Sequence, residues 1–238
     1  MRKLLVMGAS GKLLRHIVLS LIRDYELFLQ CSKRCEELKG FLTQAVGELS
    51  GLSIHLIKHN FLEEGVEVFA EKLRALTSKL DASILIEPLF NQSSFQDLRE
   101  EQIRSIVYLN LIVPMTLLRV LASFMGSEQS VIIVLTDLTP LKGSRVYAGL
   151  NPSLPTVASS AALHAVIREA PNYLPANIRV FGVALDWVNV PSKKLPLNAV
   201  SVAMSIDYVT STIKELLEDP LKLSSGTLIE LSLREKTV

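Results

Sequence analysis

The sequence has little cysteine and almost no net charge, and each shortage excludes a class of protein. Its 238 residues include only Cys31 and Cys35, too few for a disulfide framework. We therefore expect both to be structural or incidental residues of a cytoplasmic protein. The formal net charge of +1 argues against nucleic-acid binding by neutralisation of phosphates, but it is compatible with a local basic pocket for a small anion.

Long apolar runs are also missing. No stretch approaches the ~20 apolar residues that cross a bilayer, so we expect no membrane association. The opening segment, MRKLLVMGASGKLL, lacks the long apolar region and small-residue cleavage site of a signal peptide. Aromatic residues make up 6% of the chain and hydrophobic residues 49%. The apolar content is therefore mainly aliphatic, which suits a parallel sheet covered on both faces.

Short aliphatic runs alternate with amphipathic stretches along the chain. Predicted strands cover residues 3–7, 26–31, 52–58, 82–87, 131–136, 178–185 and 227–231, and predicted helices cover 13–22, 35–46, 66–80, 95–109, 113–124, 155–170 and 200–217. This alternation predicts an α/β fold with a doubly wound, parallel, Rossmann-like sheet. No repeat or linker divides the chain, so we expect a single domain over residues 1–238. Loops 138–154 and 189–197 follow strands, where such folds bind ligands.

The turn after the first predicted strand carries the first motif. Gly8-Ala9-Ser10-Gly11 and then Lys12 would place backbone N–H groups at a helix N-terminus, an arrangement that suits a pyrophosphate. Together with the order of strands and helices, the chain resembles the short-chain dehydrogenase/reductase family, whose fingerprint is Thr-Gly-x-x-x-Gly-x-Gly. In that resemblance Gly8 is the first glycine, whereas Lys12 and Leu14 replace the second and third. Lys12 either pairs with a phosphate or is a solvated lysine, and Leu14 fills space that a dinucleotide needs.

The resemblance implies further cofactor contacts at the ends of the next two strands. Ser32, Lys33 and Arg34 follow the second strand, where basic residues in the family bind the 2′-phosphate of NADP. Solvated basic residues at a helix start are the alternative. Asn60 stands after the third strand in place of an aspartate that contacts adenine, and its amide can still form a hydrogen bond.

The family's four catalytic residues are an asparagine, a serine, a tyrosine and a lysine, and the chain matches one of them. Asn110 fits the asparagine, whereas Asp137, Thr156 and Ser160 occupy the serine, tyrosine and lysine positions. The alignment of Thr156 with the tyrosine and of Ser160 with the lysine is clear. The segment Thr-Val-Ala-Ser-Ser-Ala-Ala-Leu stands where the family has Tyr-x-Ala-Ser-Lys-Ala-Ala-Leu. In the family the lysine lowers the pKa of the tyrosine, which donates the proton.

Each of these positions also has a structural interpretation. Asn110 within a helix can support a kink, and Asp137 at a strand end can cap a turn. Thr136 replaces the serine only if the register slips by one residue, and Tyr147 is a phenol in a nearby loop, which in principle can reach the site. The family's Asn-Asn-Ala-Gly segment is replaced by a run ending in Glu87-Pro88, a charge and a ring that disfavour a nicotinamide ribose.

These losses favour a catalytically degenerate homologue that acts as a binding, sensing or scaffolding subunit, with no cofactor or only weak NADP(H) binding. The alternatives are an active NAD(P)-dependent oxidoreductase with altered residues and a different enzyme on the same scaffold. The four histidines share no spacing, so we expect no metal site. Members of the family pair through two helices, which implies a homodimer or homotetramer through helices 95–124 and 155–170; a protein partner is a further possibility.

Overall fold

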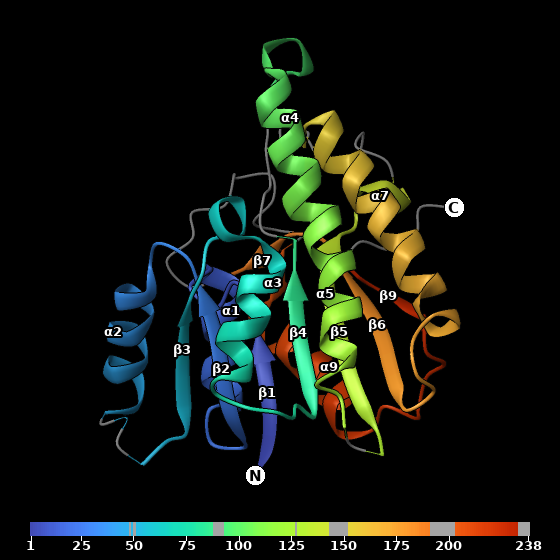
Figure 1. Ribbon diagram of the computed structural model, residues 1–238. Coiled ribbons are helices and arrows are strands. Elements are labelled where there is room, and N and C mark those ends of the chain that lie inside the picture. The colour runs from blue at the N-terminus through green and yellow to red at the C-terminus, as the bar shows by residue number, and fades with distance from the viewer. Residues whose placement is uncertain are drawn as a thin grey trace.

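Parallel strands form the centre of the protein in the computed structural model, which describes residues 1–47, 49, 51–87, 93–126, 128–142, 152–190 and 203–232 (Figure 1). The seven-stranded sheet has the order β3-β2-β1-β4-β5-β6-β9, with every neighbouring pair parallel. The strands are β1 (Arg2–Val6), β2 (Tyr25–Cys31), β3 (Ile54–Lys58), β4 (Ala82–Ile86), β5 (Ser130–Asp137), β6 (Ile178–Leu185) and β9 (Leu228–Leu231). The predicted doubly wound, Rossmann-like sheet is confirmed.

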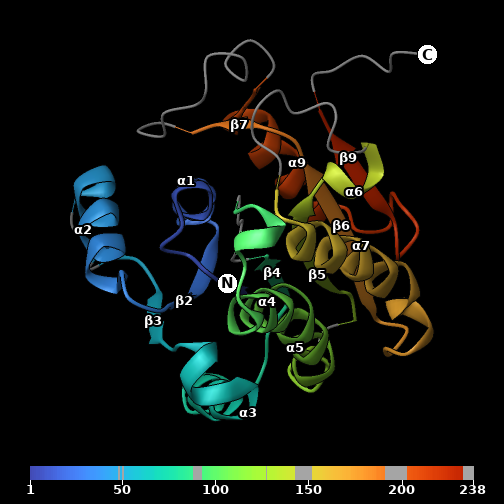
Figure 2. The same ribbon diagram turned by 90° about the horizontal axis from the view of Figure 1, so that it is seen from above.

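Helices cover both faces of this sheet, as the view from above shows (Figure 2). One face carries α1 (Lys12–Leu21), α2 (Cys35–Val46) and α9 (Ile206–Glu218). The other carries α3 (Phe61–Arg74), α5 (Val113–Ala122) and α7 (Leu154–Glu169). Shorter elements are η1 (Phe95–Asp97), α4 (Glu100–Val107), η2 (Tyr108–Ile112), α6 (Thr139–Lys142), η4 (Ala170–Asn172), β7 (Val188–Asn189) and β8 (Met204–Ser205).

Alternating side chains of the strands feed two separate cores. Leu4 and Val6 of β1 pack in the core beneath α1, whereas Leu5 packs on the opposite face beneath α3 and α5. The same alternation holds in β5, where Ile133 and Val134 point to opposite cores. Because successive strand residues point to opposite faces, a run of aliphatic residues satisfies both helix layers at once.

Three predicted helices differ from the observed ones. Within the described residues, the helix expected over 200–217 is instead β8 followed by α9, which begins at Ile206. The helix expected from residue 66 begins at Phe61, because the Asn60 side chain accepts a hydrogen bond from the Leu62 N–H and caps the first turn. It continues past Gly65, whose φ of 72° marks a kink. The helix expected over 95–109 is instead η1 followed by α4 and the π-helical η2. The short parallel pair of β7 and β8 was not predicted, because two-residue strands leave no periodic pattern.

The expectation that no stretch approaches membrane-spanning length was wrong. In the described residues, the helix Glu100–Ala122 has a mean hydropathy of 1.8 over 18 residues and is long and apolar enough to cross a membrane. Half of that stretch is buried inside the fold, where Leu117 and Leu121 pack on the sheet. A buried core helix of a soluble protein has the same length and composition.

Candidate functional site

The β1–α1 turn is built around Gly8, which has a φ of 67°. Its N–H donates to Gln30 Oε1 at 2.7 Å, and the amide of Gln30 donates to the His59 carbonyl at 2.7 Å. A Cβ on Gly8 would lie 3.0 Å from Ile86 Cγ2. The conformation and the close approach of β4 therefore both require glycine here. Gly11 precedes α1 as its N-cap, and its N–H donates to the Gly8 carbonyl at 2.8 Å.

The residues that replace the family's second and third glycines have different environments. Lys12, at the second glycine position, is exposed at the start of α1. Ser10, which lies in the turn before it, is half-buried. Leu14 is fully buried, with Cδ1 3.6 Å from where a Gly8 Cβ would lie. A glycine at residue 14 would bring α1 and the turn closer together, so Leu14 sets their spacing.

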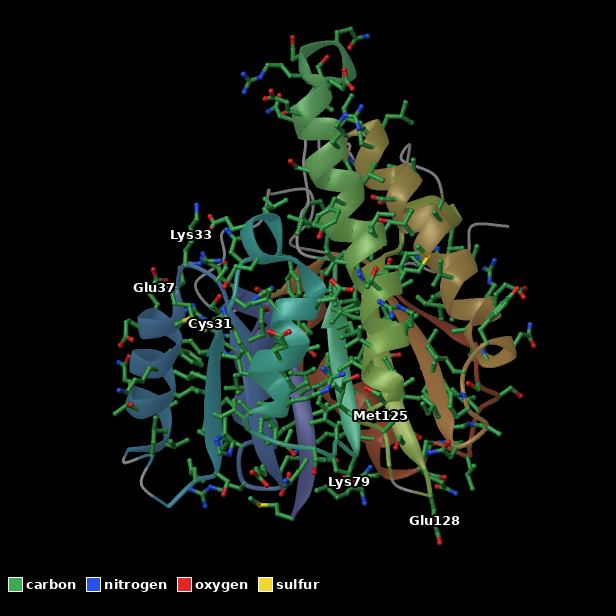
Figure 3. The ribbon with its side chains drawn as sticks, in the orientation of Figure 1. Cys31, Lys33, Glu37, Lys79, Met125 and Glu128 are labelled. Atoms are coloured by element: carbon green, nitrogen blue, oxygen red, sulfur yellow. A yellow bond between two sulfur atoms is a disulfide. The ribbon has the colours of Figure 1, made fainter. Side chains whose placement is uncertain are left out.

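The residues after β2 and β3 lie at the same end of the sheet as the Gly8 turn. Ser32 is half-buried, whereas Lys33 and Arg34 are exposed just before α2. Figure 3 labels Lys33 at this junction. Asn60 uses Oδ1 to cap α3, so it has a local structural role. Cys31 and Cys35 are joined by a disulfide across this turn. Both cysteines were expected to be structural or incidental, and the disulfide makes them structural, because it ties the start of α2 to the end of β2.

Asn110 lies buried in η2, the π-helical turn between α4 and α5. One extra residue in a helical turn displaces the ladder of backbone hydrogen bonds and turns the side chains at that point. The structural interpretation of Asn110, support of an irregular helix, therefore agrees with its position. π-Turns are also frequent at functional sites, so the position fits both interpretations.

Glu87 contacts two of the remaining catalytic positions, Ser160 and Asp137. Its Oε2 accepts a hydrogen bond from Ser160 Oγ at 2.9 Å and another from the Asp137 N–H at 3.1 Å. The Ser160 hydroxyl also approaches the Thr156 carbonyl at 3.0 Å. Burial raises the pKa of Glu87 to about 8, although the hydrogen bond from Ser160 favours the ionised form. A carboxyl thus contacts the position where the family carries an ammonium group.

The other residues around Glu87 are also held by local partners. Asp137 Oδ1 accepts the Thr139 N–H at 2.6 Å, which matches the predicted turn cap, and burial raises the pKa of Asp137. The Thr156 and Ser153 hydroxyls lie 3.0 Å apart and are buried. None of these side chains is an ammonium or a phenol.

His164 belongs to the same region, which the sequence analysis did not predict. Its Nε2 lies 3.2 Å from Thr136 Oγ1. Burial, and next the charge of Arg168, lower the pKa of His164 to about 4, so the ring is neutral near pH 7. The spacing of residues 160 and 164 on one helix face was the available signal. Among the described residues no group of three His, Cys, Asp or Glu side chains is arranged to hold a metal ion. Pro88 and Tyr147 lie outside those residues.

No family model and no curated protein matches the chain, but solved structures do. A short-chain dehydrogenase/reductase from Serratia marcescens superposes with a TM-score of 0.81, covering 97% of this chain and 96% of that one at 13% identity. The chain has the short-chain dehydrogenase/reductase fold. A short-chain dehydrogenase from Burkholderia cenocepacia in complex with NADP has a TM-score of 0.81 at 16% identity, covering 97% of this chain and 96% of that one. An acetoin dehydrogenase from Salmonella typhimurium has a TM-score of 0.76 at 15% identity, covering 97% of this chain and 94% of that one.

A groove lies on the outer surface of this fold, away from the Gly8 turn. It has a volume of about 450 Å³ and runs between α5 and the end of α7. Met115 and Tyr173 are exposed in its lining by 43% and 83%, and Leu118 forms part of its floor. Arg119 and Glu169 are its charged lining residues.

Proposed function

We propose that the protein is a short-chain dehydrogenase/reductase homologue that no longer reduces carbonyls and acts as a binding, sensing or scaffolding subunit. The observation that carries this proposal is the contact between Ser160 and the Glu87 carboxyl at the lysine position. In the family mechanism an ammonium group there lowers the pKa of the neighbouring phenol. A carboxyl does not supply that cation, because with a pKa of about 8 it is mainly neutral near pH 7. Above that pKa its negative charge disfavours loss of a proton from a neighbouring group.

The proton-donor position supports the same proposal. Thr156 has an aliphatic hydroxyl that is already paired with Ser153, and no cation touches it in the described part of the chain. General acid catalysis needs a group whose pKa is near the working pH. Thr156 does not meet that requirement, and Asp137 would add negative charge next to a developing oxyanion if it ionised.

The fit of a dinucleotide differs between the two halves of the site. The Gly8 turn, with Lys12 exposed at the start of α1, suits a phosphate, because a Cβ on Gly8 or Gly11 would crowd the turn. The Glu87 carboxyl lies against Ser160, where a nicotinamide ribose would need hydroxyl partners. We therefore propose no cofactor or only weak NADP(H) binding, held by residues of the adenosine half. When bound, NADPH would supply a hydride.

The cofactor proposal is tested by calorimetric titration with NADH and NADPH. Weak or absent binding is expected, and a micromolar dissociation constant for either would contradict it. Lys33→Gln is the matched variant, because it removes a cation from the adenosine half without touching Glu87.

One observation favours a second candidate, an active oxidoreductase with altered residues. With a pKa of about 8, Glu87 is protonated at neutral pH and is chemically a proton donor. In that case Glu87→Gln would abolish NADPH-dependent reduction while the fold is retained. Under the leading proposal neither the native chain nor Glu87→Gln shows NADPH-dependent reduction.

We also propose that the protein forms a homodimer or homotetramer through helices 95–124 and 155–170, and that it is cytoplasmic. The exposed apolar side chains of the groove between α5 and α7, Met115 and Tyr173 among them, support the self-association. Burial of such side chains favours association. A different protein partner on the same surface would leave the isolated chain monomeric in light scattering.

A further inference from the structure

The Cys31–Cys35 disulfide closes a small ring at the carboxyl end of the sheet. Cys31 is the last residue of β2 and Cys35 the first of α2. The ring encloses Ser32, Lys33 and Arg34, and Figure 3 shows Cys31 and Lys33 at this junction. These are the only two cysteines in the sequence, so within one chain each sulfur has a single possible disulfide partner.

The strand side of this ring is fixed by the sheet. The Cys31 carbonyl accepts the His59 N–H at 3.0 Å, and the preceding Gln30 carbonyl accepts the Ala9 N–H at 2.9 Å. Cys31 therefore stays in place whether or not its sulfur is bonded. On the helix side, the Arg34 carbonyl accepts the Leu38 N–H at 3.1 Å, and in the described part of the chain Ser32 and Lys33 pair with no neighbouring strand. Opening the ring would therefore loosen the short segment between these two anchors, which carries Lys33 and leads to the Arg34 side chain.

The two sulfur-bearing residues differ in access. The Cys31 side chain is fully buried, whereas Cys35 is partly exposed. A thiolate from solution can therefore attack at Cys35.

We propose that Cys31 and Cys35 form a reversible dithiol–disulfide site whose oxidation state controls binding of a phosphate monoester by Lys33 and Arg34. Attack of a reductant thiolate on Cys35 Sγ breaks the S–S bond and releases the Cys31 thiolate, which takes up a proton. The second thiol of a dithiol reductant then displaces Cys35 and becomes oxidised to a disulfide. Two electrons and two protons enter the protein in all.

The closed ring is the state that binds more tightly. It limits the conformations of Lys33 and Arg34 before a ligand arrives, so less entropy is lost on binding. Reduction removes that restriction, and we expect about five- to tenfold weaker binding. In the cytoplasm that the proposed function assigns to the protein, disulfides are usually redox-active. The proposed control of binding rests on one part of the proposed function, namely that this end of the sheet is a weak dinucleotide site.

The redox half is tested on the native, full-length chain in graded dithiothreitol and glutathione buffers. The samples are quenched with an alkylating reagent, unfolded and weighed by mass spectrometry. The expected result is a two-electron transition between zero and two alkylations, with melting of the protein little changed. A disulfide that resists excess dithiothreitol in the folded protein would overturn the proposal. So would two free thiols in the most oxidising buffer.

The binding half is tested by calorimetry with adenosine 2′,5′-bisphosphate. The oxidised chain should bind it about five- to tenfold more tightly than the reduced chain or a Cys31→Ser/Cys35→Ser variant. Lys33→Gln should weaken binding by the oxidised chain while leaving the redox transition unchanged. Equal binding in both states, or none in either, would overturn control by the disulfide. The absence of catalysis is measured separately by NADPH oxidation, so failure of one proposal is distinguishable from failure of the other.

Discussion

The buried carboxyl of Glu87 makes the free energy of unfolding depend on pH in a direction opposite to that of most carboxylates. Burial raises its pKa from 4.5 to about 8 in the folded protein. Between these values the folded state holds a proton that the unfolded state has released. This contribution to stability is therefore fully present below pH ~4.5 and is lost as the pH rises through ~8.

The size of the effect follows from the two pKa values. Their separation corresponds to ~5 kcal/mol at ~1.4 kcal/mol per pH unit. Glu87 as a whole residue is half-buried, although its carboxyl oxygen Oε1 is enclosed. Because water screens part of the residue, the expected effect is about 2–4 kcal/mol. Glu87→Gln removes the titration but keeps an oxygen that can accept the hydrogen bonds of Ser160 and the Asp137 N–H.

The assay is urea unfolding of both proteins at about pH 5.5 and about pH 8.5. The native chain should lose about 2–4 kcal/mol relative to Glu87→Gln on going to the higher pH. Asp137 and His164 are present in both proteins, so the difference isolates residue 87. Glu100→Gln, at an exposed position on α4, is the control and should not change the pH dependence. Parallel pH profiles for the native chain and Glu87→Gln would show that the pKa of Glu87 is not raised in the folded protein.

The remaining predictions concern chemistry, assembly and the first turn. Thr156→Tyr alone should not restore NADPH-dependent carbonyl reduction, because no ammonium lies four residues further on to lower the pKa of the new phenol from ~10; measurable turnover would contradict this. Met115→Asp should convert an oligomer into a monomer in light scattering, because it buries a charge in the groove, and an unchanged mass would place the interface elsewhere. Gly8→Ala should lower the unfolding free energy by about 1–3 kcal/mol, given its φ of 67°. Gly40→Ala, in α2 with open space around it, should instead be neutral or stabilising by up to ~1 kcal/mol; equal losses would deny the special role of Gly8.

Local sequence patterns predicted most of the fold. The predicted β6 over 178–185 and the predicted α2 over 35–46 agree with the observed bounds, because aliphatic runs and amphipathic periods are properties of neighbouring residues. The start of α3 was missed because a polar cap, Asn60, determines it. The helix Glu100–Ala122 was misjudged because its polar residues interrupt an otherwise apolar segment.

The site was predictable only in part. Motif frames located Asn110, Asp137, Thr156 and Ser160 in the chain, but the partner of Ser160 lies 73 residues away. Contacts at such distance depend on how β4 and α7 pack, which no local pattern contains. The disulfide was missed for a related reason. A spacing of four residues permits the bond only when a strand end and a helix start turn toward each other.

NADPH oxidation by the purified native chain, followed by absorbance, against a panel of ketones, aldehydes and quinones, decides whether the protein reduces carbonyls. We expect no rate above background, because Ser160 contacts the carboxyl of Glu87 and Thr156 cannot donate a proton. Sustained turnover by the native chain that Glu87→Gln abolishes would contradict this expectation and would identify Glu87 as the proton donor of a working reductase.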